Sequence, residues 1–225
     1  MKLFLDTASL DKVQEGVRWG VLRGVTTNPT HIANEQKDFL PLVKEICSIV
    51  KGDVSIETTG DDLDNLVRQG LEIKEIADNA VVKIAMTPNG LGATRRLSDQ
   101  GVKVNMTLTF TAAQAILAAE AGAYIVSPFL GRLDDIATDG LKVLSEICEI
   151  YAVQGYATQV LAASLRHPVH VVEAARMGAD IATMPFKVFE ALVKHPLTDA
   201  GFKRFSDDWE QAKPHLGELL PSMQT

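Results

Sequence analysis

The sequence has few features of secreted, membrane-bound or metal-binding proteins. Its 225 residues include two cysteines, Cys47 and Cys148, with neither a CxxC pair nor a Cys/His spacing typical of zinc. We expect both to be buried free thiols, which suits a reducing compartment. The N-terminal segment lacks the apolar core of a signal peptide, and no apolar run approaches the roughly 20 residues of a membrane span. These features predict a cytoplasmic protein with no membrane partner.

The charge balance is acidic. Twenty-two Lys and Arg against 29 Asp and Glu give a net charge of −7, which makes nucleic acid a poor candidate partner. A phosphorylated small molecule is still compatible with this charge, because a few local arginines suffice to bind one phosphate. The chain has no low-complexity segment and no long linker, so we expect one domain over residues 1–225.

Short apolar runs alternate with longer stretches of helical periodicity. The runs cover residues 3–7, 24–29, 54–58, 80–86, 103–110, 123–129, 157–164 and 180–186. Parallel strands need crossover helices, and eight such βα units most often close into a barrel. We therefore predict an α/β fold, a single (β/α)8 TIM barrel with an additional C-terminal helix at about 198–213. A doubly wound open sheet is the alternative, but the glycine-rich phosphate loop typical of that fold does not follow the first run.

The expected C-terminal helix carries an aromatic stripe. Phe202, Phe205 and Trp209 are spaced at i, i+3 and i+7, so they share one helix face. This face packs either on the barrel of its own chain or on a neighbouring subunit.

Polar residues recur near the C-terminal ends of the first seven predicted strands, on one face of each. They are Asp6, Asn28, Glu57, Lys83, Asn105 with Thr107, Ser127 and Ser164. In the seventh strand this places Ala162 and Ser164 inside and Leu161 and Ala163 outside. Active sites of barrels form at the C-terminal strand ends, and buried charges are costly unless they are paired. The pattern therefore predicts a reactive site in the barrel mouth.

Lys83 lies in the middle of the apolar run VVKIAM. An apolar setting disfavours the ammonium form and favours the neutral amine that attacks a carbonyl carbon. Asp6 and Glu57 come from other strands and are suited to share the proton transfers that follow. An ion-paired structural lysine is the alternative. Because no cofactor-binding loop or metal-ligand cluster stands out, we expect no cofactor and no metal.

The loops after the sixth and seventh predicted strands carry arginines. Arg132, Ser164 and Arg166 form a plausible phosphate clamp. His167 and His170 stand at i and i+3 without an apparent third ligand, so we expect a surface pair at a helix start and not a metal site.

Several segments resemble the transaldolase family, and its short-chain branch most closely. They are FLDTAS (4–9), GVTTNPT (24–30), VVKIAMT (81–87), NMTLTF (105–110), SPFLGRLDD (127–135) and LAASLRHPVH (161–170), with FSDDW (205–209) in the terminal helix. Their order and spacing cover nearly the whole chain. The resemblance implies transfer of a dihydroxyacetone unit from sedoheptulose 7-phosphate to glyceraldehyde 3-phosphate, within the pentose phosphate pathway, and a homodecamer of two pentamers.

The resemblance also implies a role for each residue. Lys83 corresponds to the Schiff-base lysine and Asp6 to the acid/base aspartate. Glu57 and Thr107 correspond to the pair that positions a proton-shuttling water. The dihydroxyacetone unit is expected against Asn28, Asn105 and Ser127, and the phosphate against Arg132, Ser164 and Arg166.

Fructose-6-phosphate aldolases resemble the same segments but have glutamine at position 57 and tyrosine at position 129. Glu57 with Phe129 is the transaldolase pairing, so release of free dihydroxyacetone is the alternative activity. The chain departs from the family at Ala85, where proline is usual, and we expect an altered strand end there. A non-catalytic sugar-phosphate binder is a further alternative, which the presence of Lys83, Asp6 and Glu57 disfavours.

Overall fold

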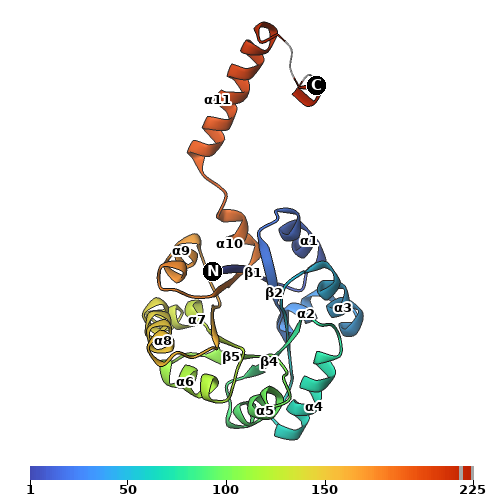
Figure 1. Ribbon diagram of the computed structural model, residues 1–225, viewed down its shortest axis with the longest axis vertical. Helices are drawn as coiled ribbons and strands as arrows, with labels where there is room; N and C mark the ends of the chain where they lie inside the picture. Colours follow the sequence, from blue (N-terminus) through green and yellow to red (C-terminus); the bar gives the residue numbers. More distant parts are fainter. Residues whose placement is uncertain (218–219, 224–225) are drawn as a thin grey trace. The chain divides into compact units, whose positions relative to one another are not determined.

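The computed structural model describes residues 1–217 and 220–223, and its central feature is a closed barrel of parallel strands. The strands are β1 (Lys2–Asp6), β2 (Leu22–Thr26), β3 (Val54–Glu57), β4 (Ala80–Ala85), β5 (Val104–Thr109), β6 (Ile125–Pro128), β7 (Gln159–Ala162) and β8 (Ile181–Met184). Each strand pairs with the next, and β8 closes on β1. Figure 1 shows the strands as an inner ring with helices around it. The predicted (β/α)8 barrel is confirmed.

Helices follow the strands in alternation. They are α1 (Leu10–Arg18), α2 (Pro29–Glu35), α3 (Phe39–Ile49), α4 (Leu63–Lys74), α5 (Pro88–Ser98), α6 (Ala112–Glu120), α7 (Leu130–Asp134), α8 (Gly140–Gln154), α9 (Pro168–Arg176) and α10 (Phe186–Ala191). Proline occupies the first turn of α2, α5 and α9, where its missing N–H costs no helical hydrogen bond. Sharp helix starts of this kind leave only short loops after β2, β4 and β7.

The lower interior of the barrel is apolar. Phe4, Ile125, Leu161, Ala163 and Ile181 form a buried cluster contributed by different strands. Gly24 on β2 makes room for the largest of these side chains, because a Cβ at that position would lie 2.3 Å from Cζ of Phe4. The cluster fills this part of the barrel interior with apolar side chains.

The predicted inner face of the seventh strand is wrong. Leu161 and Ala163 belong to the interior cluster, and Leu161 pairs with Ile181 of β8 in the same register row. The alternation was extended to Ser164, but this residue does not belong to the strand. Strand β7 ends at Ala162, and Ser164 adopts a left-handed conformation with φ of 58°. The turn, and not strand alternation, brings Ser164 to the mouth.

Strand β4 runs through Ala85, which pairs with Thr107 of β5. The carbonyl oxygen of Ala85 also accepts a hydrogen bond of 2.9 Å from the backbone N–H of Thr87. The strand end is thus regular up to the residue where the family usually has proline.

The chain divides into two compact units, Met1–Phe189 and Glu190–Thr225. The second unit contains helix α11 (Pro196–Ala212), which begins after His195, and the short 3₁₀ turns η1 (Lys213–His215) and η2 (Pro221–Met223). The expected C-terminal helix is confirmed, two residues earlier at its start than predicted. Within the described residues, no helix combines the length and the apolar character needed to span a bilayer.

Candidate active site

Strand register places the central polar residues in one row. Glu57 on β3 pairs with Lys83 on β4, and Lys83 pairs with Asn105 on β5. Residues paired in this way point to the same face of the sheet, here the interior. The register alone therefore brings the carboxylate, the amine and the amide side by side, as the sequence predicted.

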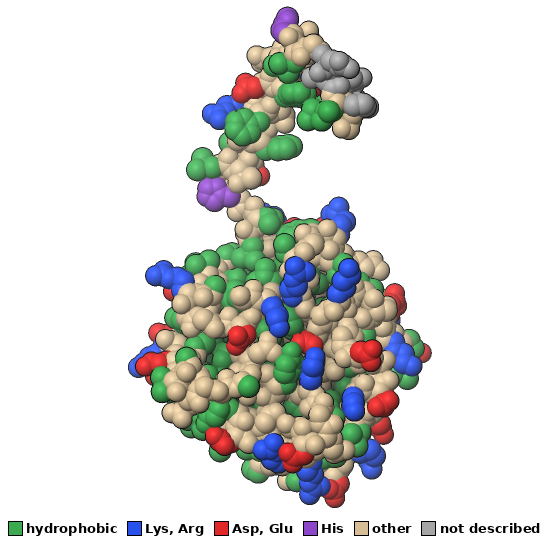
Figure 2. Space-filling model, viewed as in Figure 1, with side chains coloured by type: hydrophobic (Ala, Val, Ile, Leu, Met, Phe, Trp, Pro, Cys, Tyr) green, Lys and Arg blue, Asp and Glu red, His purple; other side chains and the backbone are tan. Residues whose placement is uncertain are grey.

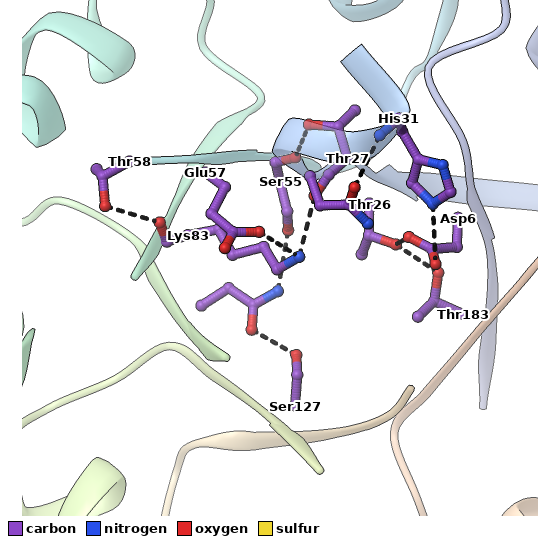
Figure 3. A network of polar contacts seen from close by, with 12 residues as sticks. Asp6, Thr26, Thr27, His31, Ser55, Glu57, Thr58, Lys83, Ser127 and Thr183 are labelled. Carbon is purple, nitrogen blue, oxygen red and sulfur yellow. Dashed lines mark hydrogen bonds and ion pairs between the residues drawn. The ribbon is translucent and has the colours of Figure 1, made fainter. Parts of the chain in front are cut away.

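Lys83 is almost completely buried and has two polar partners. Its Nζ atom lies 2.8 Å from Oε2 of Glu57, and it donates a hydrogen bond of 3.0 Å to the carbonyl oxygen of Thr27 (Figure 3). The side chain is 5% exposed and that of Glu57 is 16% exposed. The surroundings are thus less apolar than the run VVKIAM suggested. Glu57 is a base within direct reach of the amine.

A second chain of hydrogen bonds links β3, β5 and β6 beside Lys83. Ser127 donates to Oδ1 of Asn105 at 2.6 Å, and the Asn105 amide donates to the hydroxyl of Ser55 at 3.1 Å. All three residues are buried. The bonds fix the Asn105 side chain in one orientation, so its position does not depend on a bound ligand.

Thr107 is buried on β5, and its hydroxyl finds no hydrogen-bond partner among the described residues. A buried hydroxyl without a partner is costly, and such groups are commonly satisfied by an ordered water or a ligand. This arrangement is compatible with the water-holding role that the family resemblance implies for Thr107.

Asp6 lies on β1, and each of its oxygens has a partner (Figure 3). Oδ1 accepts a hydrogen bond of 2.8 Å from Thr26, and Oδ2 lies 3.2 Å from Nε2 of His31. Burial raises the pKa of Asp6, but the hydrogen bond and charge of His31, the charge of Lys83 and the Thr26 hydroxyl outweigh it, so the pKa is lowered. The carboxylate therefore stays ionised and ready to accept a proton.

The mouth of the barrel holds a cavity of about 250 Å³. Its lining includes these predicted site residues: Asp6, Asn28, Lys83, Ser127, Phe129, Arg132, Ser164 and Arg166. Glu57, Asn105 and Thr107 lie outside this lining, and Glu57 and Asn105 connect to it through Lys83 and Ser127. The arrangement provides a buried amine, an ionised carboxylate and two guanidinium groups around one small cavity.

Arg132 lies in the short helix α7 and Arg166 in the loop after β7, and these two segments approach closely. Gly131 in α7 donates its backbone N–H to the carbonyl of Ser164 at 3.1 Å, and a Cβ at Gly131 would lie 2.3 Å from Nε of Arg166. Any side chain at Gly131 would push the two loops apart. Arg166 also pairs with Asp135 at 2.8 Å. The loops therefore hold Arg132 and Arg166 at the same rim without a bound anion.

The prediction of a surface histidine pair is half wrong. His167 is exposed, but His170 is buried, and its Nε2 lies 3.3 Å from Oδ2 of Asp134. Burial and the charge of His167 lower the pKa of His170, against the opposing effect of Asp134. The Nδ1 atom of His170 accepts from the backbone N–H of Arg166 at 3.3 Å. His170 thus holds the backbone at Arg166 in place through this hydrogen bond.

Sequence reasoning missed two residues of the site, Thr183 and His31. Thr183 on β8 shares a hydrogen bond of 2.7 Å with Thr26, which in turn contacts Asp6. The alternation pattern, applied to the eighth strand as well, would have found Thr183. His31 gave no such signal, because it belongs to α2 and not to a strand.

Both cysteines are free, and Cys47 is buried as expected. Cys148 is half-buried, which corrects the expectation of two buried thiols. Burial raises the pKa of each thiol to about 11. Among the described residues, no cluster of three or more His, Cys, Asp and Glu side chains is arranged to hold a metal ion.

Comparisons with known proteins agree with this geometry. Residues 3–218 match the family model described as transaldolase/fructose-6-phosphate aldolase. Relatives named "Probable transaldolase" include those of Kosmotoga olearia, 50% identical over 96% of this chain and 100% of its own length, and of Aquifex aeolicus, 51% identical over 94% of this chain and 97% of its own length. That of Thermoanaerobacter sp. is 52% identical over 94% of this chain and 98% of its own length.

A solved structure, thiamine phosphate pyrophosphorylase from Pyrococcus furiosus, is similar in fold. It superposes with a TM-score of 0.58 over 85% of this chain and 93% of its own, at 15% identity. This identity supports the barrel and nothing about chemistry. The family match and the relatives at about half identity cover almost the whole chain, and we conclude that this protein belongs to the transaldolase/fructose-6-phosphate aldolase family.

Proposed function

We propose that this enzyme is a transaldolase that carries a dihydroxyacetone unit as a Schiff base on Lys83. The observation that supports it best is the ion pair of Lys83 and Glu57, with Nζ and Oε2 2.8 Å apart, in which the buried Lys83 lines the same cavity as Asp6. The sugar-phosphate substrates follow from the family. We infer sedoheptulose 7-phosphate as donor and glyceraldehyde 3-phosphate as acceptor, giving erythrose 4-phosphate and fructose 6-phosphate.

The first step uses the neutral amine of Lys83. Glu57 takes a proton from Nζ, the amine attacks C2 of the ketose, and the carbinolamine loses its oxygen as water after protonation. A water held by Glu57 and by the hydroxyl of Thr107, which lacks a partner among the described residues, would carry that proton. The product is an iminium ion on Lys83.

The second step breaks the C3–C4 bond. Asp6 accepts the proton of the C4 hydroxyl, the aldehyde leaves, and the electron pair of the broken bond moves toward the iminium nitrogen to give an enamine. The acceptor aldehyde then reacts with C3, and Asp6 returns its proton to the new hydroxyl. Hydrolysis of the imine regenerates Lys83 and releases the product ketose.

The remaining residues position the two sugars. We assign the dihydroxyacetone hydroxyls to Asn28, Asn105 and Ser127. Asn105 is pre-oriented by its bonds to Ser127 and Ser55. The phosphate of either aldehyde fits the rim of Arg132, Ser164 and Arg166, because two guanidinium groups there face the cavity that Lys83 lines.

Transaldolase activity and aldolase activity differ in what happens to the enamine. A phenol at position 129 would offer a proton that releases dihydroxyacetone, whereas Phe129 offers none. Its ring packs edge-on against Phe110 at 6.0 Å. The enamine therefore persists until an acceptor aldehyde binds, which favours transfer of the dihydroxyacetone unit over its release.

Acceptor dependence tests the proposal. Glyceraldehyde 3-phosphate release from fructose 6-phosphate is measured with and without erythrose 4-phosphate. Release only with erythrose 4-phosphate supports a transaldolase. Equal release in both reactions identifies a fructose-6-phosphate aldolase, and no release in either favours the sugar-phosphate binder.

We also propose a homo-oligomer, a decamer of two pentamers, acting in the cytoplasm. No residue of α11 is buried, and Phe202 and Phe205 are 75% and 64% exposed. Figure 2 shows apolar side chains along this helix. An aromatic stripe of this kind is suited to a neighbouring subunit. Light scattering coupled to gel filtration would give the mass, and a monomer would refute the oligomer.

A further inference from the structure

One polar side chain of the cavity, that of His31, has no part in the steps above. His31, the third residue of α2, lines the cavity with its ring 29% exposed. Its backbone N–H donates to Oδ1 of Asn28 at 2.8 Å, which is the N-cap bond of the helix. This bond fixes the backbone of His31 at the start of α2, and from there the ring reaches Asp6 on β1.

The ring meets the oxygen of Asp6 that Thr26 leaves free. Thr26 donates to Oδ1 at 2.8 Å, while Nε2 of His31 lies 3.2 Å from Oδ2. The two partners come from different elements, β2 and α2, so they hold the carboxylate plane from two sides (Figure 3). Thr26 is itself held by Thr183 at 2.7 Å.

We propose that His31 is a positioning residue for Asp6, whose Nε2–H aims the carboxylate at the C4 hydroxyl of the bound ketose and keeps it in the ionised form that accepts the proton. This inference rests on the proposed function, because Asp6 acts as a base only in carbon–carbon cleavage. A neutral aliphatic side chain at position 31 would keep the N-cap hydrogen bond, which uses the backbone N–H of this residue. It would leave Oδ2 of Asp6 without a hydrogen-bond donor.

Other charged side chains surround the cavity, and one of them, Lys83, acts on the same carboxylate. Lys83, Arg132 and Arg166 line the cavity with Asp6 and His31, and Glu57 is paired with Lys83. The charge of Lys83 also lowers the pKa of Asp6, and the iminium ion keeps that positive charge. Among the described residues, the side chains of Thr26 and His31 are the hydrogen-bonding partners of the Asp6 carboxylate, so His31 supplies an orienting contact that Lys83 does not.

Two variants of the full-length enzyme separate positioning from simple packing. His31→Leu removes the donor, and His31→Gln keeps an amide N–H near the place of Nε2. We expect His31→Leu to lower the rate of erythrose 4-phosphate-dependent glyceraldehyde 3-phosphate release by about 10-fold near neutral pH. We also expect the acid limb of its pH profile to move to higher pH, because the bond that lowers the pKa of Asp6 is lost. His31→Gln should restore most of the rate.

Two further measurements make the result decisive. Borohydride trapping of fructose 6-phosphate should remain at the wild-type level in both variants, since imine formation precedes the step that needs Asp6. The titration of the Asp6 carboxyl carbon, followed by NMR in the ligand-free protein, should shift to higher pH in His31→Leu. An unmoved titration, or equal loss of rate in both variants at every pH, would overturn the role of His31 even if adducts form. Absence of any adduct in the wild-type enzyme would instead overturn the proposed function and this role with it.

Discussion

The amine of Lys83 and the carboxylate of Glu57 are 2.8 Å apart in the interior of a closed eight-stranded barrel. They occupy paired positions of β4 and β3, so strand register fixes their contact. Removing one member of a buried pair leaves the other without a partner, which is more costly than losing both. A buried ion pair therefore adds little to the stability of the fold, whereas its short distance allows a proton to pass from Lys83 to Glu57.

Replacement of Lys83 by methionine should abolish turnover while keeping the barrel folded. We expect the rate to fall by about 10⁴-fold or more, because Lys83 is the only lysine among the described residues that line the cavity. The unfolding free energy should fall by about 1–3 kcal/mol, since Glu57 loses its partner. Steady-state assays and thermal melting measure the two effects. Lys103→Met is the control, because Lys103 is 46% exposed and pairs with Asp53. An equal loss of activity in this control would contradict a specific role for Lys83.

A tyrosine at position 129 should shift the enzyme toward aldolase activity. The new hydroxyl would reach into the cavity that Phe129 lines and could protonate the enamine carbon. We expect release of free dihydroxyacetone without an acceptor to rise by about 10-fold. Phe110→Tyr changes the ring that packs against Phe129 and serves as the control. If both variants release dihydroxyacetone equally, the phenol does not act at the proposed position.

Loss of a guanidinium from the rim should weaken binding of phosphorylated sugars alone. Arg166→Gln removes a charge-assisted contact that is typically worth 1.5–3 kcal/mol, so KM for erythrose 4-phosphate should rise by roughly 10- to 100-fold. KM for unphosphorylated erythrose should change little. Arg176→Gln, at an exposed position on α9, is the matched control. A similar rise for both sugars would place the phosphate elsewhere.

Asp6 should make stability depend on pH in a defined direction. Its pKa is lowered in the folded protein, so its ionisation stabilises the fold above the ordinary value of 3.8, and this contribution is lost as the pH falls through the lowered value. The stability gap between wild type and Asp6→Asn should therefore be largest above about pH 5 and narrow toward pH 3. Urea unfolding across this range measures it. Asp11→Asn, at an exposed position of α1, gives the background of losing one surface carboxylate. A gap that widens on acidification would contradict the lowered pKa.

Much of the site followed from the sequence because strand alternation is a strict rule. Lys83, Glu57 and Asn105 were placed on one interior face, and the pairing of β3, β4 and β5 puts them in one row. The rule failed where the chain leaves the strand. Ser164 reaches the mouth through a residue conformation that is left-handed, and the alternation of inward and outward side chains does not apply there.

The family resemblance and the barrel are confirmed, but burial at single positions was harder to predict. Cys148 is only half-buried and His170 is buried, although the sequence suggested the reverse for the histidine. His31 was missed because its place in the site depends on a side-chain contact between α2 and β1. Such packing between distant segments is a property of the assembled barrel and leaves no local pattern.

Borohydride trapping tests the central claim most directly. The enzyme is incubated with fructose 6-phosphate, reduced with borohydride and digested, and the peptides are analysed by mass spectrometry. A stable dihydroxyacetone or hexose phosphate adduct on the peptide that contains Lys83, absent from Lys83→Met, is the predicted result. An adduct on another lysine, or no adduct while turnover continues, would contradict the Schiff-base mechanism.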